Sequence, residues 1–304
     1  GFFVRLLFKN RINTSGFIIW SLLVASIFPV SVPLYIPFCT EFVTVFLFGS
    51  FLGGRENNGF NIPAFGSLFA YMAWPYAMAS YAISGANREI EAISASTPIQ
   101  KLAETVSSNL FRQDGFSLLQ EMGFRISRTD KSITDYLNTV LFNDFKSNMP
   151  YGFFDFIFGA RSSTIIESGL FIIILGTIIL FALGYYKYIT SFSATFVFLV
   201  LVYIFGLGLP GEDLFRGNVL LAVLNHGILP AMLVFGIFPE NSCISRLGQF
   251  IFGLILGTIS YLIILFKTGS SGLFLSICIV NILMMLISNR RQTAGNMQGN
   301  NNEK

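Results

Sequence analysis

The stretch TIIESGLFIIILGTIILFALGYY, residues 164–186, contains one charged side chain, Glu167, and is otherwise almost wholly apolar. Roughly 20 apolar residues are what an α-helix needs to cross a hydrocarbon core about 30 Å thick. Because lipid offers the backbone no hydrogen-bond partners, a run of this kind inside a membrane has to be helical. The stretch therefore predicts a membrane-spanning helix.

Seven other apolar runs share this character. They cover residues 17–29, 34–52, 63–83, 189–207, 217–238, 247–266 and 272–287. Over the 304 residues, 53% are hydrophobic and 12% are charged, whereas a soluble domain carries roughly 25% charged residues. We therefore predict an all-α fold, a polytopic transmembrane helical bundle.

Polar stretches between the apolar runs divide the chain into four parts. Residues 1–83 form a first membrane half, 84–163 a long polar loop, 164–288 a second membrane half and 289–304 a disordered polar tail. Gly/Asn- or Gly/Ser-rich breaks at 53–64 and 269–272 precede a span in each half, which indicates an inverted repeat. Residues 1–8 read as the end of an apolar segment, so we expect the first half to be truncated.

Positive charges indicate how the bundle is oriented. Alternation of the spans puts seven basic residues on one side, Lys9, Arg11, Arg55, Lys187, Arg246, Arg290 and Arg291, and only Arg216 and Lys267 in the opposite short loops. The richer side is cytoplasmic by the positive-inside rule. This places the loop 84–163 outside the cytoplasm and the C-terminus inside it. The net charge of +3 is spread thinly, which excludes a nucleic-acid footprint.

Few residues are suited to catalysis. Cys39, Cys243 and Cys278 are far apart in the sequence and are interpreted as packing residues, so no metal site and no catalytic set is expected. The single histidine, His226, follows Asn225 in an apolar run and either lines a cavity or relays a proton or ion. Glu41 and Glu167 are acids within or beside predicted spans. Each is either a functional carboxylate or a helix-terminal one at the interface.

Two further motifs have both a structural and a functional interpretation. The segment GGRENNGFNIPA, residues 53–64, contains Asn58 and Asn61 and is either an ordinary loop or irregular backbone that lines a cavity. Pro63 can open the following helix at its first position. In the polar loop, EAISASTPIQ, residues 91–100, is suited to a helix start, with Thr97 as N-cap and Gln100 closing a capping box.

These motifs together resemble one family, the NqrB/RnfD membrane subunits of sodium-pumping NADH:quinone oxidoreductase and of the Rnf complex. The family's flavin-carrying pattern, an acidic residue, Ser-x-Ala-Thr, then Pro and an aliphatic residue, is similar to Glu91, Ser94, Thr97, Pro98 and Ile99, with Ser96 where Ala is usual. Its GG…FN-PA turn resembles Gly53-Gly54 followed by residues 60–64. Residues 69–78, 162–170 and 246–253 also match, in order, so the resemblance runs from about Asn13 to Arg291.

The resemblance implies a ten-helix fold, of which about eight helices are present, in a bacterial inner membrane. It implies FMN held covalently on Thr97, with Ser94 and Glu91 in its attachment motif, and a second flavin such as riboflavin. The partners implied are the other subunits of an NQR- or Rnf-type complex and a flavin transferase. Activity would be that of a subunit of an ion-translocating oxidoreductase. The candidates for the ion pathway are Asn58, Asn61, Glu167, Asn225 and His226.

The sequence departs from the family pattern at two places, and two alternative functions stay open. The chain has Ile237-Phe238-Pro239 where the family has Thr-Asp-Pro, and Ser15 before Gly16-Phe17 where sodium-pumping members often have Glu. Direct reduction of quinone by this chain is therefore not expected. A passive channel or permease, or a non-redox scaffold of the same fold, would share the apolar helices and the polar breaks.

Overall fold

The structure is a computed structural model whose described residues are helices and the turns between them. It describes residues 14–46, 61–80, 126–142, 149–158, 163–184, 188–207, 214–215, 217, 219, 222–223, 227–237, 246–266 and 271–284. No strand occurs within these ranges. The predicted all-α fold is confirmed for this part of the chain, and the division into four parts stays a prediction.

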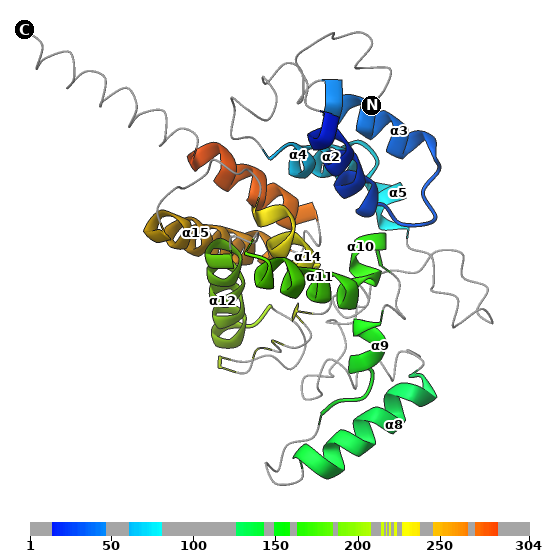
Figure 1. Cartoon of the computed structure of the whole chain (residues 1–304), viewed down its shortest axis with the longest axis vertical. Helices are drawn as coiled ribbons and strands as arrows, with labels where there is room; N and C mark the ends of the chain where they lie inside the picture. Colours follow the sequence, from blue (N-terminus) through cyan, green and yellow to red (C-terminus); the bar gives the residue numbers. More distant parts are fainter. Residues whose placement is uncertain are drawn as a thin grey trace, which may run out of the picture.

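The first half is a helical hairpin followed by a broken helix (Figure 1). Helices α2 (Thr14–Ser26) and α3 (Tyr35–Val43) pack on each other and on α4 (Ile62–Ala73). The expected single span 63–83 is wrong in detail, because the chain breaks at Trp74 and restarts as α5 (Pro75–Ala79). Pro75 has no N–H to continue α4 but is suited to the first turn of a new helix.

The described end of the polar loop contains two helices that cap each other. They are α8 (Arg128–Leu137), extended by the π-turn η4 (Asn138–Phe142), and α9 (Phe153–Ile157). The buried Asp130 carboxylate accepts hydrogen bonds from the N–H groups of Gly152, Phe154 and Asp155 at the start of α9. The Asp155 carboxylate accepts in return from the N–H and hydroxyl of Ser127, the N-cap of α8. The segment therefore has a definite structure of its own.

The second half begins with a short helix and a long one. Helix α10 (Ile165–Ser168) ends at Gly169, and α11 (Leu170–Ala182) follows directly. Next come α12 (Tyr188–Phe205), the short α14 (Ile228–Leu233), the 3₁₀ turn η6 (Phe235–Ile237), α15 (Arg246–Leu265) and a helix over Ser271–Met284. The predicted span is thus helical over Ile165–Ser168 and Leu170–Ala182 and is interrupted at Gly169.

Helices α12 and α15 pack together most extensively among the described helices, and small residues make this possible. A Cβ built on Gly257 of α15 would lie 2.4 Å from the carbonyl oxygen of Ala194 on α12. A Cβ on Gly253, one turn earlier, would lie 2.6 Å from the carbonyl oxygen of Thr190. Two glycines four residues apart are the packing motif by which membrane helices bring their backbones together.

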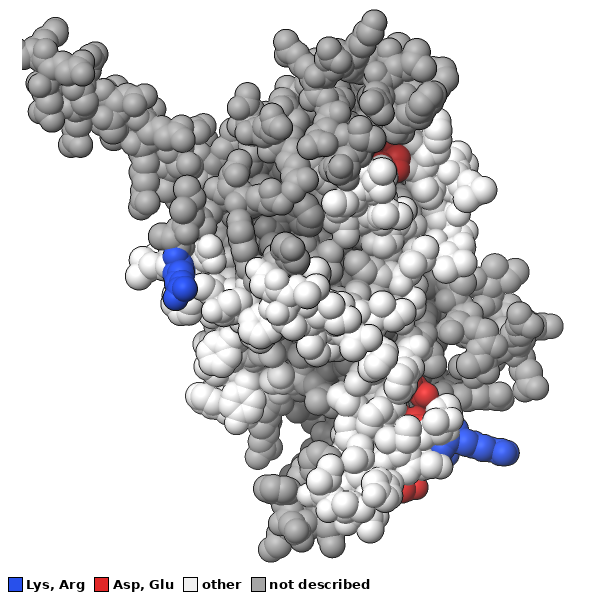
Figure 2. All heavy atoms as spheres, in the orientation of Figure 1, with Lys and Arg blue, Asp and Glu red and all other residues white. Residues whose placement is uncertain are grey.

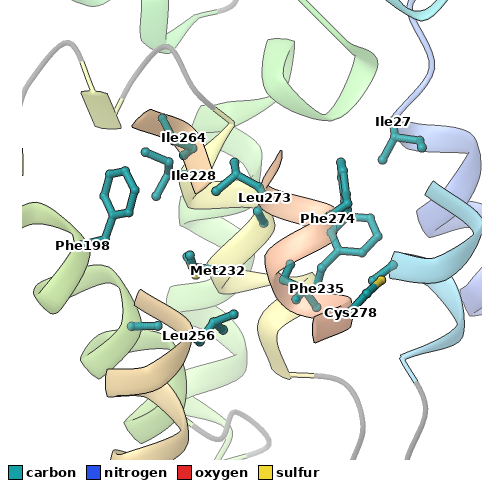
Figure 3. Close-up of a cluster of buried hydrophobic side chains, with 14 of the residues drawn as sticks. Ile27, Phe198, Ile228, Met232, Phe235, Leu256, Ile264, Leu273, Phe274 and Cys278 are labelled. Carbon is teal, nitrogen blue, oxygen red and sulfur yellow. The ribbon is translucent and has the colours of Figure 1, made fainter. Parts of the chain in front are cut away.

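One hydrophobic core joins the two halves. Figure 3 shows Phe198 of α12, Met232 of α14 and Leu256 of α15 with side chains of the Ser271–Met284 helix, and Ile27 beyond the end of α2. The same buried cluster includes residues of α3, α4 and α5. Segments far apart in the sequence are therefore held by one apolar interior.

The outer surface of the described helices is largely apolar, as expected of a protein surrounded by lipid. Two helices, α12 and α15, are long and apolar enough to cross a membrane, and four more apolar helices are shorter: Tyr35–Phe46, Ile62–Ala73, Leu170–Ala182 and Ser271–Met284. Helix α11 exposes large side chains over most of its circumference, including Ile172, Ile178 and Phe181. Figure 2 shows few charged side chains among the described atoms of this face. Contiguous exposed apolar surface of this kind marks a membrane or protein interaction surface.

Candidate functional site

Helix α14 is the short buried helix around which the candidate site is built. Ile228, Pro230, Ala231 and Met232 are all buried. Its ends interrupt regular hydrogen bonding, and side chains from other helices replace the missing partners. The hydroxyl of Ser191 on α12 donates to the carbonyl oxygen of Met232 at 2.9 Å. Irregular backbone at membrane depth is tolerated only where protein or a polar cavity satisfies it.

Glu167 lies against the start of α14. It belongs to α10 and is 4% exposed. Thr164 is the N-cap of α10, and its hydroxyl oxygen accepts a hydrogen bond from the Glu167 N–H at 3.4 Å. The N–H of Ile165 donates to the carbonyl oxygen of Phe28, after α2, at 3.3 Å. The cap and this link between the two halves hold the Glu167 backbone in place.

Gly227 makes room for the Glu167 carboxyl group. Its φ of +64° is a conformation that side chains with a Cβ rarely adopt. A Cβ at this position would lie 2.3 Å from Oε1 of Glu167. The carboxyl group therefore packs directly on the backbone where α14 begins, and any other residue at position 227 would displace it.

Asn61 binds the other end of this segment. Its side-chain oxygen accepts from the Ala64 N–H at 3.1 Å, which makes it the N-cap of α4. Pro63 lies in the first turn, at the second helical position and not at the first as predicted. Its amide nitrogen donates to the carbonyl oxygen of Phe235 in η6 at 2.6 Å. The Asn61 N–H donates to Oδ1 of Asn281, in the Ser271–Met284 helix, at 3.3 Å.

Two predicted residues thus contact opposite ends of one short segment. Gly227, beside Glu167, and Phe235, beside Asn61, are eight residues apart, about 12 Å along a helix. Within the described spans on either side of the polar loop, the charged residues are Glu41, Glu167 and Arg246. A buried carboxyl group packed against the start of a short, interrupted helix is suited to binding a proton or a small cation in transit.

The structure tests only part of the predicted site. Glu91, Ser94, Thr97, Asn58, Asn225 and His226 lie outside the described residues. Gly227 directly follows His226, so the predicted Asn225-His226 pair adjoins the Glu167 contact in sequence. Among the described residues no group of three or more His, Cys, Asp or Glu is placed to hold a metal ion.

Three contributing residues were not predicted. Ser191 and Asn281 are polar residues within apolar runs, a signal that the sequence offers. Gly227 offers no such signal, because glycine is common in membrane helices. Its role comes from contact with a carboxyl group 60 residues away in the sequence.

Comparison with known proteins assigns the chain. A search of curated proteins finds no match. The model of the NQR2, RnfD, RnfE family matches residues 2–295, which is nearly the full sequence. The match includes both membrane halves, the polar loop between them and every residue of the candidate site. The chain therefore belongs to the NQR2, RnfD, RnfE family and is a membrane subunit of an Rnf- or NQR-type complex.

Proposed function

We propose that this chain is the flavin-bearing membrane subunit of a redox-driven, ion-translocating electron transport complex, with FMN covalently held on Thr97. The observation that carries the proposal is the family match over residues 2–295, within which the flavin-attachment pattern Glu91, Ser94, Thr97 and Pro98 occurs in order. The alternative functions, channel and scaffold, require no such motif.

The attachment would join the Thr97 hydroxyl to the phosphate of FMN as a phosphoester. A flavin transferase would catalyse the transfer from a flavin dinucleotide: the Thr97 hydroxyl attacks the FMN phosphate, the pyrophosphate bond breaks, the nucleoside monophosphate leaves and the hydroxyl proton is released. The other subunits of the complex would supply and accept electrons. Flavins, when bound, supply one- and two-electron redox chemistry, while the protein supplies position and electrostatics. The resemblance implies a bacterial inner membrane, and the positive-inside distribution supports an orientation with the polar loop extracytoplasmic and the C-terminus cytoplasmic.

Ion movement would use the contact between Glu167 and Gly227. Glu167 is the buried acid of the described second half, and it lies beside the backbone that leads into Asn225 and His226. Asn58, Asn225 and His226 are the further candidates, with sodium as the ion implied by the resemblance. Asn61 is a less mobile candidate, since its side chain caps α4 and binds the Phe235 carbonyl.

The experiment is in-gel flavin fluorescence of the denatured chain, expressed with a flavin transferase and followed by peptide mass mapping. We expect a fluorescent band, with the mass of FMN on the peptide that contains Thr97. The Thr97→Ala variant should be dark, whereas Thr105→Ala, a threonine nearby in the same loop, should remain fluorescent. Fluorescence that persists in Thr97→Ala contradicts the attachment site.

A dark wild-type band has a different meaning. If the transferase modifies a control substrate in the same cells and this chain stays dark, the fold is present without its flavin. The channel and scaffold interpretations would then lead, and solute flux into vesicles without redox partners would separate them.

A further inference from the structure

A second acidic side chain lies within the membrane portion, in the α2–α3 hairpin of the first half. Glu41 is in α3, where its neighbours Phe38 and Phe42 are exposed apolar side chains on the outer face. The hydroxyl of Ser21 on α2 donates to Oε2 of Glu41 at 3.0 Å. The second carboxyl oxygen, Oε1, is buried and has no hydrogen-bond partner among the residues that the structure describes.

No side chain of the described helices around Glu41 carries a positive charge, and the N-terminal amino group acts on its carboxylate more weakly than burial does. The described helices that pack against α3 are α2 and α4, and neither Thr14–Ser26 nor Ile62–Ala73 contains Lys, Arg, His, Asp or Glu. An ionised carboxylate without a cationic side chain beside it is costly in a medium of low polarity. Adding one proton removes that charge, and the hydrogen bond from Ser21 is retained by the neutral acid.

Buried polar side chains lie beside Glu41 in the hairpin. Thr40 is fully buried, and its hydroxyl also has no hydrogen-bond partner among the described residues. One turn later the hydroxyl of Thr44 donates to the carbonyl oxygen of Thr40 at 2.7 Å. Gly66 of α4 allows this approach, because a Cβ there would lie 2.2 Å from the Thr44 hydroxyl oxygen.

We propose that Glu41 is a proton-binding site of the membrane portion, separate from Glu167, in which the carboxyl group exchanges one proton while it keeps the hydrogen bond from Ser21. The reaction is the addition of one proton to the carboxylate, and no other reactant is needed. The site does not depend on the flavin or on the ion pathway near α14. A reversible protonation at this depth is the minimum requirement of a coupling carboxylate.

The test is labelling of the full chain by a membrane-permeant carbodiimide, read out by peptide mass mapping. Carbodiimides add to a protonated carboxyl group in apolar surroundings to give a stable N-acylurea. We expect the adduct on Glu41, with a labelling rate that falls as the pH is raised. Ser21→Ala should shift the pH dependence of Glu41 labelling and leave that of Glu167 unchanged. The carboxylate of Asp130, which accepts three backbone N–H groups outside the spans, should remain unlabelled in the same sample.

Three outcomes would overturn the proposal. The first is an unlabelled Glu41 whose unmodified peptide is recovered in full. The second is labelling at a rate that does not change with pH. The third is protection of Glu41 by sodium but not by choline at equal ionic strength, which would assign a metal-cation site in place of a proton site. Because the labelling needs no flavin, a chain that stays dark in the fluorescence experiment leaves this test intact.

Discussion

At the scale of single residues, a substitution at Gly227 tests the candidate site, because the added methyl group would meet the Glu167 carboxyl group. Gly227→Ala adds a Cβ at φ +64° and 2.3 Å from Oε1 of Glu167. We expect a loss of stability of about 1–2 kcal/mol from the left-handed backbone and about 1–3 kcal/mol more from overpacking. The measurement is thermal unfolding of the purified chain in detergent.

A matched control exists on the same half of the molecule. Gly184 has a similar φ of +75°, but a Cβ there meets nothing within 4 Å. Gly184→Ala should therefore show the backbone cost alone. Equal losses for the two variants would mean that the Glu167 carboxyl group moves away freely, and the close contact would carry no functional argument.

Tyr151 in the polar loop gives a prediction about pH. Its hydroxyl donates to Oδ1 of Asp135 at 2.7 Å, and this hydrogen bond, with the negative charge of Asp135, raises the pKa of Tyr151 above its usual 10.0. A raised folded-state pKa means that the contact contributes stability fully below the unfolded pKa of about 10 and loses it as pH rises through the folded value.

The measurement is an absorbance titration of phenolate formation in the wild type and in Tyr151→Phe. Subtracting the curve of the variant from that of the wild type isolates the ionisation of Tyr151. The difference should be one tyrosine that ionises at higher pH than a free tyrosine. Asp135→Asn removes the charge and should bring this ionisation back toward the usual pKa. A difference curve that already coincides with free tyrosine in the wild type would contradict the contact.

At the scale of secondary-structure elements, the packing of α12 against α15 depends on two small positions. Gly257→Ala places a Cβ 2.4 Å from the Ala194 carbonyl oxygen, where only backbone could give way. We expect a loss of about 1–3 kcal/mol from overpacking, measured by thermal unfolding. Gly176→Ala on α11 is the control, because open space surrounds its Cβ.

The control variant should change the stability in the opposite direction. Alanine in an exposed helix interior is favoured over glycine by roughly 0.5–1 kcal/mol, so Gly176→Ala should be neutral or slightly stabilising. A Gly257→Ala variant as stable as wild type would show that the two helices are free to separate by a few tenths of an ångström.

At the scale of the whole molecule, polar contacts between the halves accompany the shared core. The Asn61 N–H donates to Asn281, and its side-chain amide donates to the Phe235 carbonyl, so one residue of the first half binds two elements of the second. Asn281→Ala removes one acceptor, and a lost buried hydrogen bond costs about 1 kcal/mol.

The effect of Asn281→Ala can be measured as a change in how firmly the two halves stay associated. A protease site inserted between residues 84 and 125 allows the chain to be cut, after which co-purification of the two pieces in mild detergent is measured. We expect the wild-type pieces to stay together and the Asn281→Ala pieces to separate more readily. Ile282→Ala, the neighbouring and 40% exposed residue, should behave as wild type. Wild-type pieces that separate at once would show that the described contacts do not hold the halves together.

The sequence by itself determined the class of the molecule and its family. Apolar runs of membrane length can only be helical in lipid, so composition was enough for the all-α bundle. Collinear motifs were enough for the NQR2, RnfD, RnfE family, which the family match confirms. The sequence also predicted one local feature within one residue: Pro63 lies in the first turn of α4.

Only the tertiary structure decided which distant residues meet. The break at Gly169 lies inside a run that looks continuous, and apolar composition does not encode where such a helix stops. The break at Trp74 is a local one by contrast, because Pro75 follows it. The contact of Glu167 with Gly227, and those of Asn61 with Phe235 and Asn281, join segments 60, 174 and 220 residues apart. Such pairings follow from how the helices close around one core, and no local pattern in the sequence specifies them.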